Sequence, residues 1–151
     1  MWLAILAGGA GAGAADIVSA IANRRDPLIV LQYIASGLIG KIAVAGGWFS
    51  ALAGLAVHFG LTTIMAALFV LAARRWAVLW QKPWPAGLCY GVLVYVAMFY
   101  VIVPHSAAPA WKTPEGFWRN VGAAMGHAFF VGLPIASAAR HFLGRNDARM
   151  I

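Results

Sequence analysis

Charged side chains are scarce in this sequence, and acidic ones are the scarcest. Of its 151 residues, 11 are Lys or Arg and 4 are Asp or Glu, so only 10% of the chain is charged. A soluble domain of this size carries about a quarter charged residues. The chain therefore lacks the polar surface that a globule needs in water, and we expect lipid to solvate most of it.

Cysteine and the common catalytic motifs are also missing. Cys89 is the only cysteine, so no disulfide can form within the chain. The sequence has no HExxH or CxxC spacing, no phosphate-binding loop and no nucleophile beside a base. The absence of these motifs argues against the chemistry of a soluble enzyme. We therefore predict no catalytic residue from the sequence.

Long apolar runs are what the sequence does contain. The central run, Trp48–Ala73, has 26 residues without a charge. At about 1.5 Å per residue it is long enough to cross a bilayer core of roughly 30 Å. Comparable runs predict an all-α polytopic membrane helix bundle, a single membrane domain over residues 1–151. The four predicted transmembrane helices span residues 2–22, 48–73, 86–103 and 119–142.

The segment at residues 27–40 is apolar, but polar residues interrupt it. We expect an interfacial or re-entrant helix here, with Pro27 as its first residue and Asp26 as its N-cap. If residues 28–45 crossed the membrane instead, there would be five spans, which the positive-inside rule favours. That span would be short and joined by a very tight turn, so we predict four spans plus this helix.

Aromatic and basic residues gather at the ends of the predicted spans. All seven tryptophans lie at or near these ends, as in the aromatic belts of membrane proteins. The formal net charge of +7 comes from cations that flank the apolar runs, which fits anionic headgroups and not nucleic acid. The predicted interface residues are Trp48, Arg74, Arg75, Trp76, Trp80, Trp84 and Trp118.

Two GxxxG patterns predict close helix packing. Gly9 and Gly13 lie in the first span, and Gly122 and Gly126 lie in the fourth. In lipid, such small residues allow helix backbones to approach each other closely. The pairs would serve packing within the bundle or self-association, so a homo-oligomer or a larger membrane complex remains open.

Three polar side chains are predicted to share one depth in the bilayer. His58 is ten residues past Trp48, His127 is nine past Trp118, and Asp16 is seven before Asn23, which follows the first span. These offsets correspond to about 15, 13 and 10 Å along helices that reach the same face. Two imidazoles and a carboxylate are therefore expected in one layer of the bundle interior.

Three functions fit such a layer. Two histidines on facing helices can ligate haem b, and two histidines with an aspartate can hold a divalent metal ion, as in a redox or sensing component. The same groups can carry protons or a small solute. They can also act only as hydrogen-bonding groups between helices, in a non-catalytic accessory or oligomerising protein. The sequence leaves all three open.

Four stretches resemble small uncharacterised bacterial inner-membrane proteins, with the YagU-like family as the nearest named group. They are VLQYIASGLIG (30–40), LAGLAVHF (52–59), VIVPHSAAP (101–109) and GHAFFVGLPIA (126–136). The resemblance covers most of the chain. It implies a four-helix protein of the bacterial inner membrane, in a family associated with acid resistance. It brings no catalytic motif to carry over onto these residues.

Overall fold

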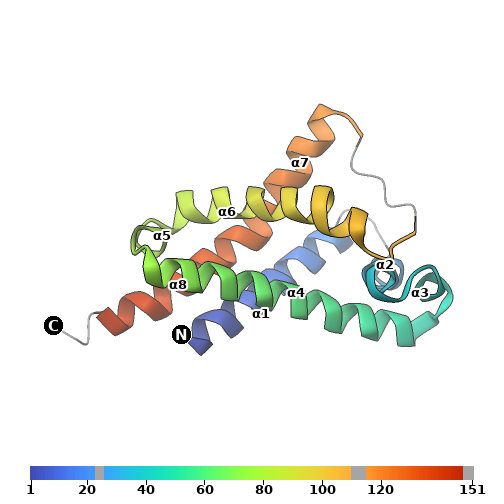
Figure 1. Ribbon diagram of the computed structural model, residues 1–151, viewed down its shortest axis with the longest axis horizontal. Helices are drawn as coiled ribbons and strands as arrows, with labels where there is room; N and C mark the ends of the chain where they lie inside the picture. Colours follow the sequence, from blue (N-terminus) through green and yellow to red (C-terminus); the bar gives the residue numbers. More distant parts are fainter. Residues whose placement is uncertain (23–25, 110–114, 148–151) are drawn as a thin grey trace.

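The computed structural model describes residues 1–22, 26–109 and 115–147, and contains no strand within these ranges. The helices are shown in Figure 1. In chain order they are α1 (Trp2–Ala22), α2 (Pro27–Ile39), α3 (Ile42–Ala45), α4 (Gly47–Arg75), α5 (Val78–Gln81), α6 (Pro83–Ala97), the π-helical η1 (Met98–Ile102), the 3-10 helix η2 (Val103–His105), α7 (Phe117–His127), the π-helical η3 (Ala128–Gly132) and α8 (Leu133–Asp147).

Four helical runs are long and apolar enough to cross a bilayer, and they make the protein an all-α polytopic membrane bundle. They are α1, α4, the continuous run Pro83–His105 and the continuous run Phe117–Gly144. Helix α1 packs on α4 and α8, and α6 packs on η3 and α8. The start of α1, the end of α8 and α5 lie at one end of the bundle, and α2 and α3 lie at the other (Figure 1).

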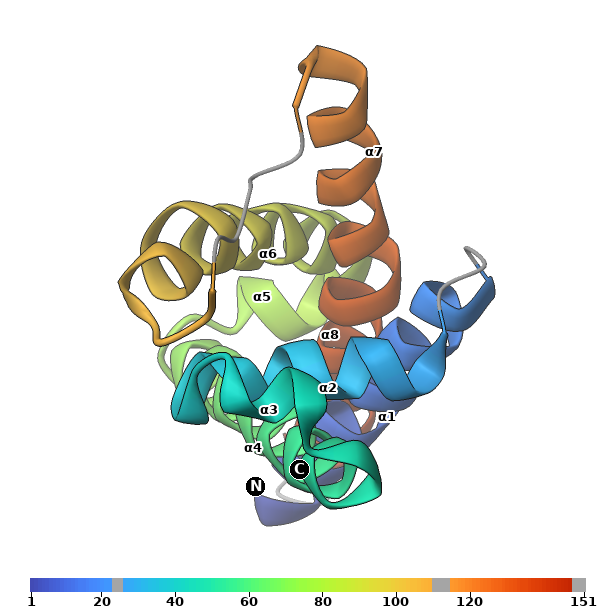
Figure 2. The same cartoon turned by 90° about the vertical axis from the view of Figure 1, so that its right-hand side faces the viewer.

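Helix α2 is the shorter apolar helix that the sequence predicts between the first two spans. Pro27 is its first residue, and the Leu28 amide donates to the Asp26 carboxylate at 2.9 Å, which confirms the predicted N-cap. The helix ends at Gly40, whose φ of 70° favours glycine. Figure 1 shows α2 end-on where α4 runs lengthwise, and Figure 2 shows the reverse, so α2 lies across the end of the bundle.

A backbone contact holds α2 against α4. A Cβ atom added at Gly54 of α4 would collide with the Leu31 carbonyl group of α2. The buried Gln32 amide also donates to the Gly47 carbonyl oxygen at 3.1 Å, across the turn that leads into α4. The absence of a side chain at Gly54 is therefore what allows α2 to pack closely on the long helix.

In the half of the bundle next to α5, the buried core residues are all apolar. These residues come from α1, α4, α6, η3 and α8. The buried members are Ala4, Ile5, Ala12, Ala66, Phe69, Val70, Ala73, Val94, Val131, Ile135, Ala136 and Ala139. Many are alanines, which allow the helices to pack at short distances in lipid.

A second close contact joins α6 to η3. A Cβ atom added at Gly91 would collide with the backbone of His127 and Ala128, and one added at Gly132 would collide with the Gly87 carbonyl oxygen. Gly87 and Gly91 are spaced as in a GxxxG pattern, although the sequence interpretation did not single them out. They are the small residues at which the third and fourth spans meet.

The first turns of α7 project away from the other helices of the bundle (Figure 2). Phe117 and Trp118 at its start are 71% and 80% exposed. A Cβ atom added at Gly122 or Gly126 would meet nothing within 4 Å. This GxxxG pattern therefore makes no close packing contact with the residues that the structure describes. It lies on a helix face that the structure leaves open.

The aromatic residues predicted at the membrane interface lie near helix ends. Trp48, Trp76, Trp84 and Trp118 are each more than half exposed, as expected for rings that face headgroups. Trp111, which also supported the predicted boundaries, lies outside the described residues.

Candidate functional site

One small cavity inside the bundle brings together the three polar residues singled out by depth. Asp16 of α1, His58 of α4 and His127 of α7 all line it. Its volume is about 60 Å³, and the rest of its wall is mainly apolar. The other lining residues are Leu61, Thr62, Met65, Val94, Met98 and Val131. A water molecule needs roughly 10–15 Å³ of such volume, so a few waters or a small ion fit.

His58 is fixed by a hydrogen bond between helices. The residue is 7% exposed, and its Nε2 atom lies 3.0 Å from the carbonyl oxygen of Gly13 in α1. A carbonyl oxygen can only accept, so Nε2 carries the hydrogen and donates it. In a neutral imidazole the Nδ1 atom is then an acceptor, and it remains available for a proton or another ligand.

His127 is fixed by its own helix and by aromatic rings. Its Nδ1 atom lies 3.0 Å from the Ala123 carbonyl oxygen, so Nδ1 donates and Nε2 is the acceptor of the neutral ring. Its ring centroid lies 5.5 Å from that of Tyr95 and 5.6 Å from that of Phe99. The π-helical segment η3 follows at Ala128, and such segments are frequent at functional sites.

Asp16 is partly buried and has no hydrogen-bonding or ion-pair partner among the described residues. A carboxylate within a membrane bundle is costly unless it is neutralised or reaches water. Asp16 lines the wall of a cavity that is large enough to hold water. Asp16 is thus the least satisfied polar group of the site and the one most open to a small ligand.

The cavity does not hold a preformed metal centre. Within the part of the chain that the structure describes, no three His, Cys, Asp or Glu side chains lie close enough together to hold a metal ion. Asp16, His58 and His127 share the cavity wall, but they do not converge as ligands. The predicted metal site would therefore require side-chain movement before it formed.

Haem b does not fit the site. Pockets for molecules of drug size are about 300–1,000 Å³, several times the cavity's volume of about 60 Å³. The Nε2 atom of His58 is also already engaged by the Gly13 carbonyl oxygen. The cavity is of a size suited to protons, water or a single ion. Its volume depends on helix packing, so the sequence alone could not predict it.

A second polar group, which the sequence interpretation missed, lies beyond the His127 ring. The hydroxyls of Tyr95 and Tyr100 both donate to Oδ1 of Asn120, at 2.6 and 2.7 Å. The Asn120 amide donates in turn to the Gly116 carbonyl oxygen at 3.0 Å. Tyr95 is only 3% exposed, whereas Tyr100 is half exposed. The signal in the sequence was an asparagine at the start of the predicted fourth span, beside Arg119.

Comparisons of the chain with protein-family models, with curated proteins and with solved structures found no match. The resemblance to the YagU-like family therefore remains a proposal.

Proposed function

We propose that this multi-pass membrane protein binds protons in its Asp16, His58 and His127 cavity and responds to them. The observation that carries the proposal is that three proton-accepting side chains from three different helices line one water-sized cavity. Each imidazole has one ring nitrogen fixed by a backbone carbonyl oxygen and one left as an acceptor. Intramembrane groups of this kind form the proton-binding sites of many membrane proteins.

Protonation would change how the helices interact. A protonated imidazole is a cation, and the Asp16 carboxylate in the same cavity attracts it. Because His58 is on α4 and His127 is on α7, that attraction would pull both helices toward α1. The proposed response is therefore a change in packing among these three helices.

Protons would enter from the end of the bundle at which α2 lies. Toward the end of the bundle at which α5 lies, the cavity is followed by a core whose buried residues are all apolar, with the Tyr90 hydroxyl beside it donating to the Met65 carbonyl oxygen. Toward the other end lie His58, Tyr95 and Asn120, with their hydrogen bonds. A polar approach on one side and a dry core on the other favour a one-sided proton-binding site over a continuous conduit.

Infrared difference spectroscopy on the reconstituted full chain tests the proposal. On acidification we expect a carboxylic acid C=O band that disappears in Asp16→Asn and remains in the control Glu115→Gln, whose exposed carboxylate is remote from the cavity. We also expect the band to shift in His58→Gln and in His127→Gln, because both rings share the cavity with Asp16. A band unaffected by either histidine change would refute a shared proton site.

A vesicle assay separates proton binding from conduction. In vesicles that enclose a pH-sensitive dye, an imposed pH gradient should dissipate no faster with the protein than without it, because the apolar core blocks the path. Rapid dissipation that is lost in Asp16→Asn would instead establish the conduit that the sequence left open. The same assay can be run on Glu115→Gln as a matched control.

A divalent metal ion is the second candidate ligand. The acceptor nitrogens of His58 and His127, together with the Asp16 carboxylate, make a donor set suited to Zn²⁺ or a similar ion. Metal analysis after equilibration with Zn²⁺ would show stoichiometric metal that is lost in both His58→Ala and His127→Ala. Metal-free protein would leave the proton site, or helix packing alone, as the role of these residues.

The wider setting is proposed from the sequence. The four spans make the protein multi-pass. The resemblance to small bacterial proteins would place it in the inner membrane, where an acid-resistance role would fit a proton-binding cavity. The open face of α7, with Gly122 and Gly126, is where a second copy or a larger membrane complex would associate. In such an accessory role the cavity would only hold helices together.

A further inference from the structure

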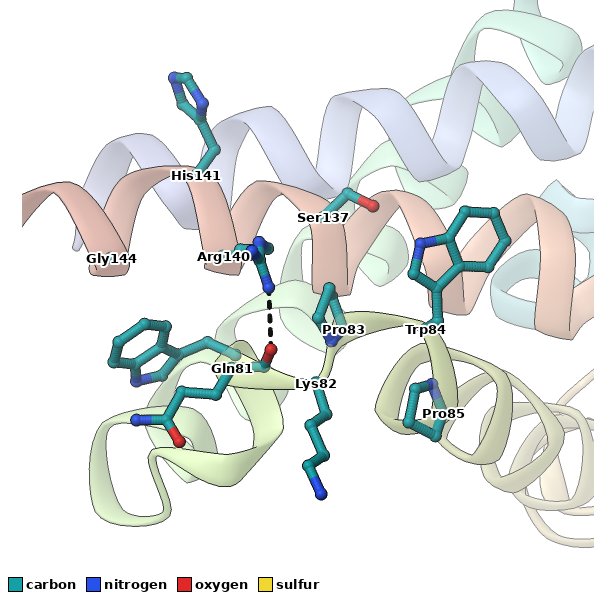
Figure 3. A pocket seen from close by; sticks show the side chains of 10 residues that line it. Gln81, Lys82, Pro83, Trp84, Pro85, Ser137, Arg140, His141 and Gly144 are labelled. Atoms are coloured by element: carbon teal, nitrogen blue, oxygen red, sulfur yellow. Dashed lines mark hydrogen bonds between the residues drawn. The ribbon is translucent and has the colours of Figure 1, made fainter.

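A large groove lies at the end of the bundle where α5 lies, and it shares no lining residue with the proton-binding cavity. It has a volume of about 1160 Å³ and lies between α5, the start of α6, and α8 (Figure 3). None of its lining residues is acidic. The lining residues are Trp80, Gln81, Lys82, Pro83, Trp84, Pro85, Ser137, Arg140, His141 and Gly144.

One hydrogen bond sets the position of the main cation in this α5–α8 groove. Figure 3 shows the Arg140 side chain reaching from α8 to the Gln81 carbonyl group, and its Nη1 atom donates to that oxygen at 2.8 Å. A guanidinium has five N–H donors, so the others remain for a ligand. The bond holds Arg140 at the wall of the groove and ties α8 to the turn before α6.

A second cation and two indole rings complete the groove. Lys82 extends from the turn on the side away from α8 in Figure 3, on a flexible stem that lets its ammonium group move toward a ligand. The Trp80 ring lies against Gly144, where an added Cβ atom would be 3.3 Å from it. Trp84 is 67% exposed at the start of α6. Tryptophan rings of this kind favour the level of lipid headgroups.

We propose that the α5–α8 groove binds the phosphate headgroup of an anionic phospholipid. Arg140 and Lys82 would hold the phosphate, and the rings of Trp80 and Trp84 would lie beside the glycerol region. Basic pockets between transmembrane helices bind anionic headgroups by this chemistry. The groove lies at the end of the bundle where α4 ends in Arg74 and Arg75, so the surroundings are also cationic.

Native mass spectrometry of the purified full chain, with lipid added in detergent, tests this assignment. We expect phosphatidylglycerol to be retained about tenfold more tightly than phosphatidylcholine. Lys82→Gln and Arg140→Gln should each weaken phosphatidylglycerol retention about fivefold, and the double variant roughly thirtyfold. Because Arg140→Gln also removes the bond to Gln81, Lys82→Gln is the variant that leaves the wall of the groove intact.

A matched control removes the same charge outside the groove. Lys41→Gln/Arg119→Gln also lowers the charge by two, and both residues are exposed and neither lines the groove. It should leave the lipid preference unchanged. Equal retention of both lipids, or an equal loss in this control, would overturn the proposal. Displacement of the lipid by an equal concentration of inorganic phosphate would assign the groove to free phosphate and overturn it too.

Discussion

The His58 imidazole of α4 reaches the carbonyl oxygen of Gly13 in α1, with Nε2 and the oxygen 3.0 Å apart. This bond forms where α1 has no side chain. A Cβ atom added at Gly13 would lie 2.7 Å from the Phe59 ring and 3.0 Å from the Thr62 hydroxyl oxygen. The glycine therefore lets the two helices approach closely enough for the imidazole to bond a backbone carbonyl three residues before Asp16.

Replacing His58 should destabilise the bundle measurably. His58→Ala removes the bond to Gly13 and leaves a gap beside the cavity, so we expect a loss of about 1–3 kcal/mol in the free energy of unfolding in detergent. His105→Ala is the control, because its ring is exposed and bonds only Val101 in its own helical run. Equal stability losses in the two variants would contradict a helix-bridging role for His58.

The contact between α1 and α4 predicts opposite outcomes for two glycine substitutions. A Cβ atom added at Gly9 would lie 2.7 Å from the Cα and Oγ1 atoms of Thr63, whereas one added at Gly60 meets nothing within 4 Å. Gly9→Ala should therefore cost about 1–3 kcal/mol of stability. Gly60→Ala should be neutral or slightly stabilising, because alanine favours a helix over glycine. Thermal unfolding of both variants in one detergent checks this, and a stable Gly9→Ala would refute the close contact.

Substitutions at Gly91 and Gly126 can distinguish packing within one chain from association between two copies. Gly91→Ala would press on the backbone of η3, so we expect lower stability with the oligomeric state unchanged. Gly126→Ala adds a methyl group that meets nothing within 4 Å among the described residues, so it should leave monomer stability unchanged. If the open face of α7 binds a second copy, Gly126→Ala should instead lower the dimer fraction in detergent, as measured by light scattering. A monomeric wild-type protein would rule out that use of the face.

The stability contributions of Asn120 and the buried Tyr95 should be coupled, because the two side chains share a hydrogen bond. Asn120→Ala leaves the hydroxyl of Tyr95, which is 3% exposed, without its acceptor, and we expect a cost of about 1–3 kcal/mol. Tyr95→Phe should cost less, and the double variant should cost little more than Asn120→Ala alone. Tyr100→Phe is the control because that ring is half exposed. Strictly additive losses for Tyr95 and Asn120 would contradict the coupling.

The sequence by itself determined the solvent and the class of fold. With 10% charged residues and apolar runs of membrane length, the chain can satisfy its backbone polar groups in lipid only as helices, and the four spans and the capped helix α2 follow from this. Residue counts along each helix also predicted a common depth for Asp16, His58 and His127, because the rise per residue is constant. The spans and α2 were therefore predicted from local sequence alone. The common depth of the three polar residues needed only the geometry of a helix.

Only the tertiary structure decided how those parts meet. Which glycines make close contacts depends on the rotation of each helix about its axis, and this is why Gly91 packs tightly while Gly126 stays open. The cavity's size, which excludes haem, depends on how side chains from several helices fill the space between them. The α5–α8 groove joins residues that are about sixty positions apart, such as Gln81 and Arg140. Helix packing sets each of these relationships, and no local pattern encodes it.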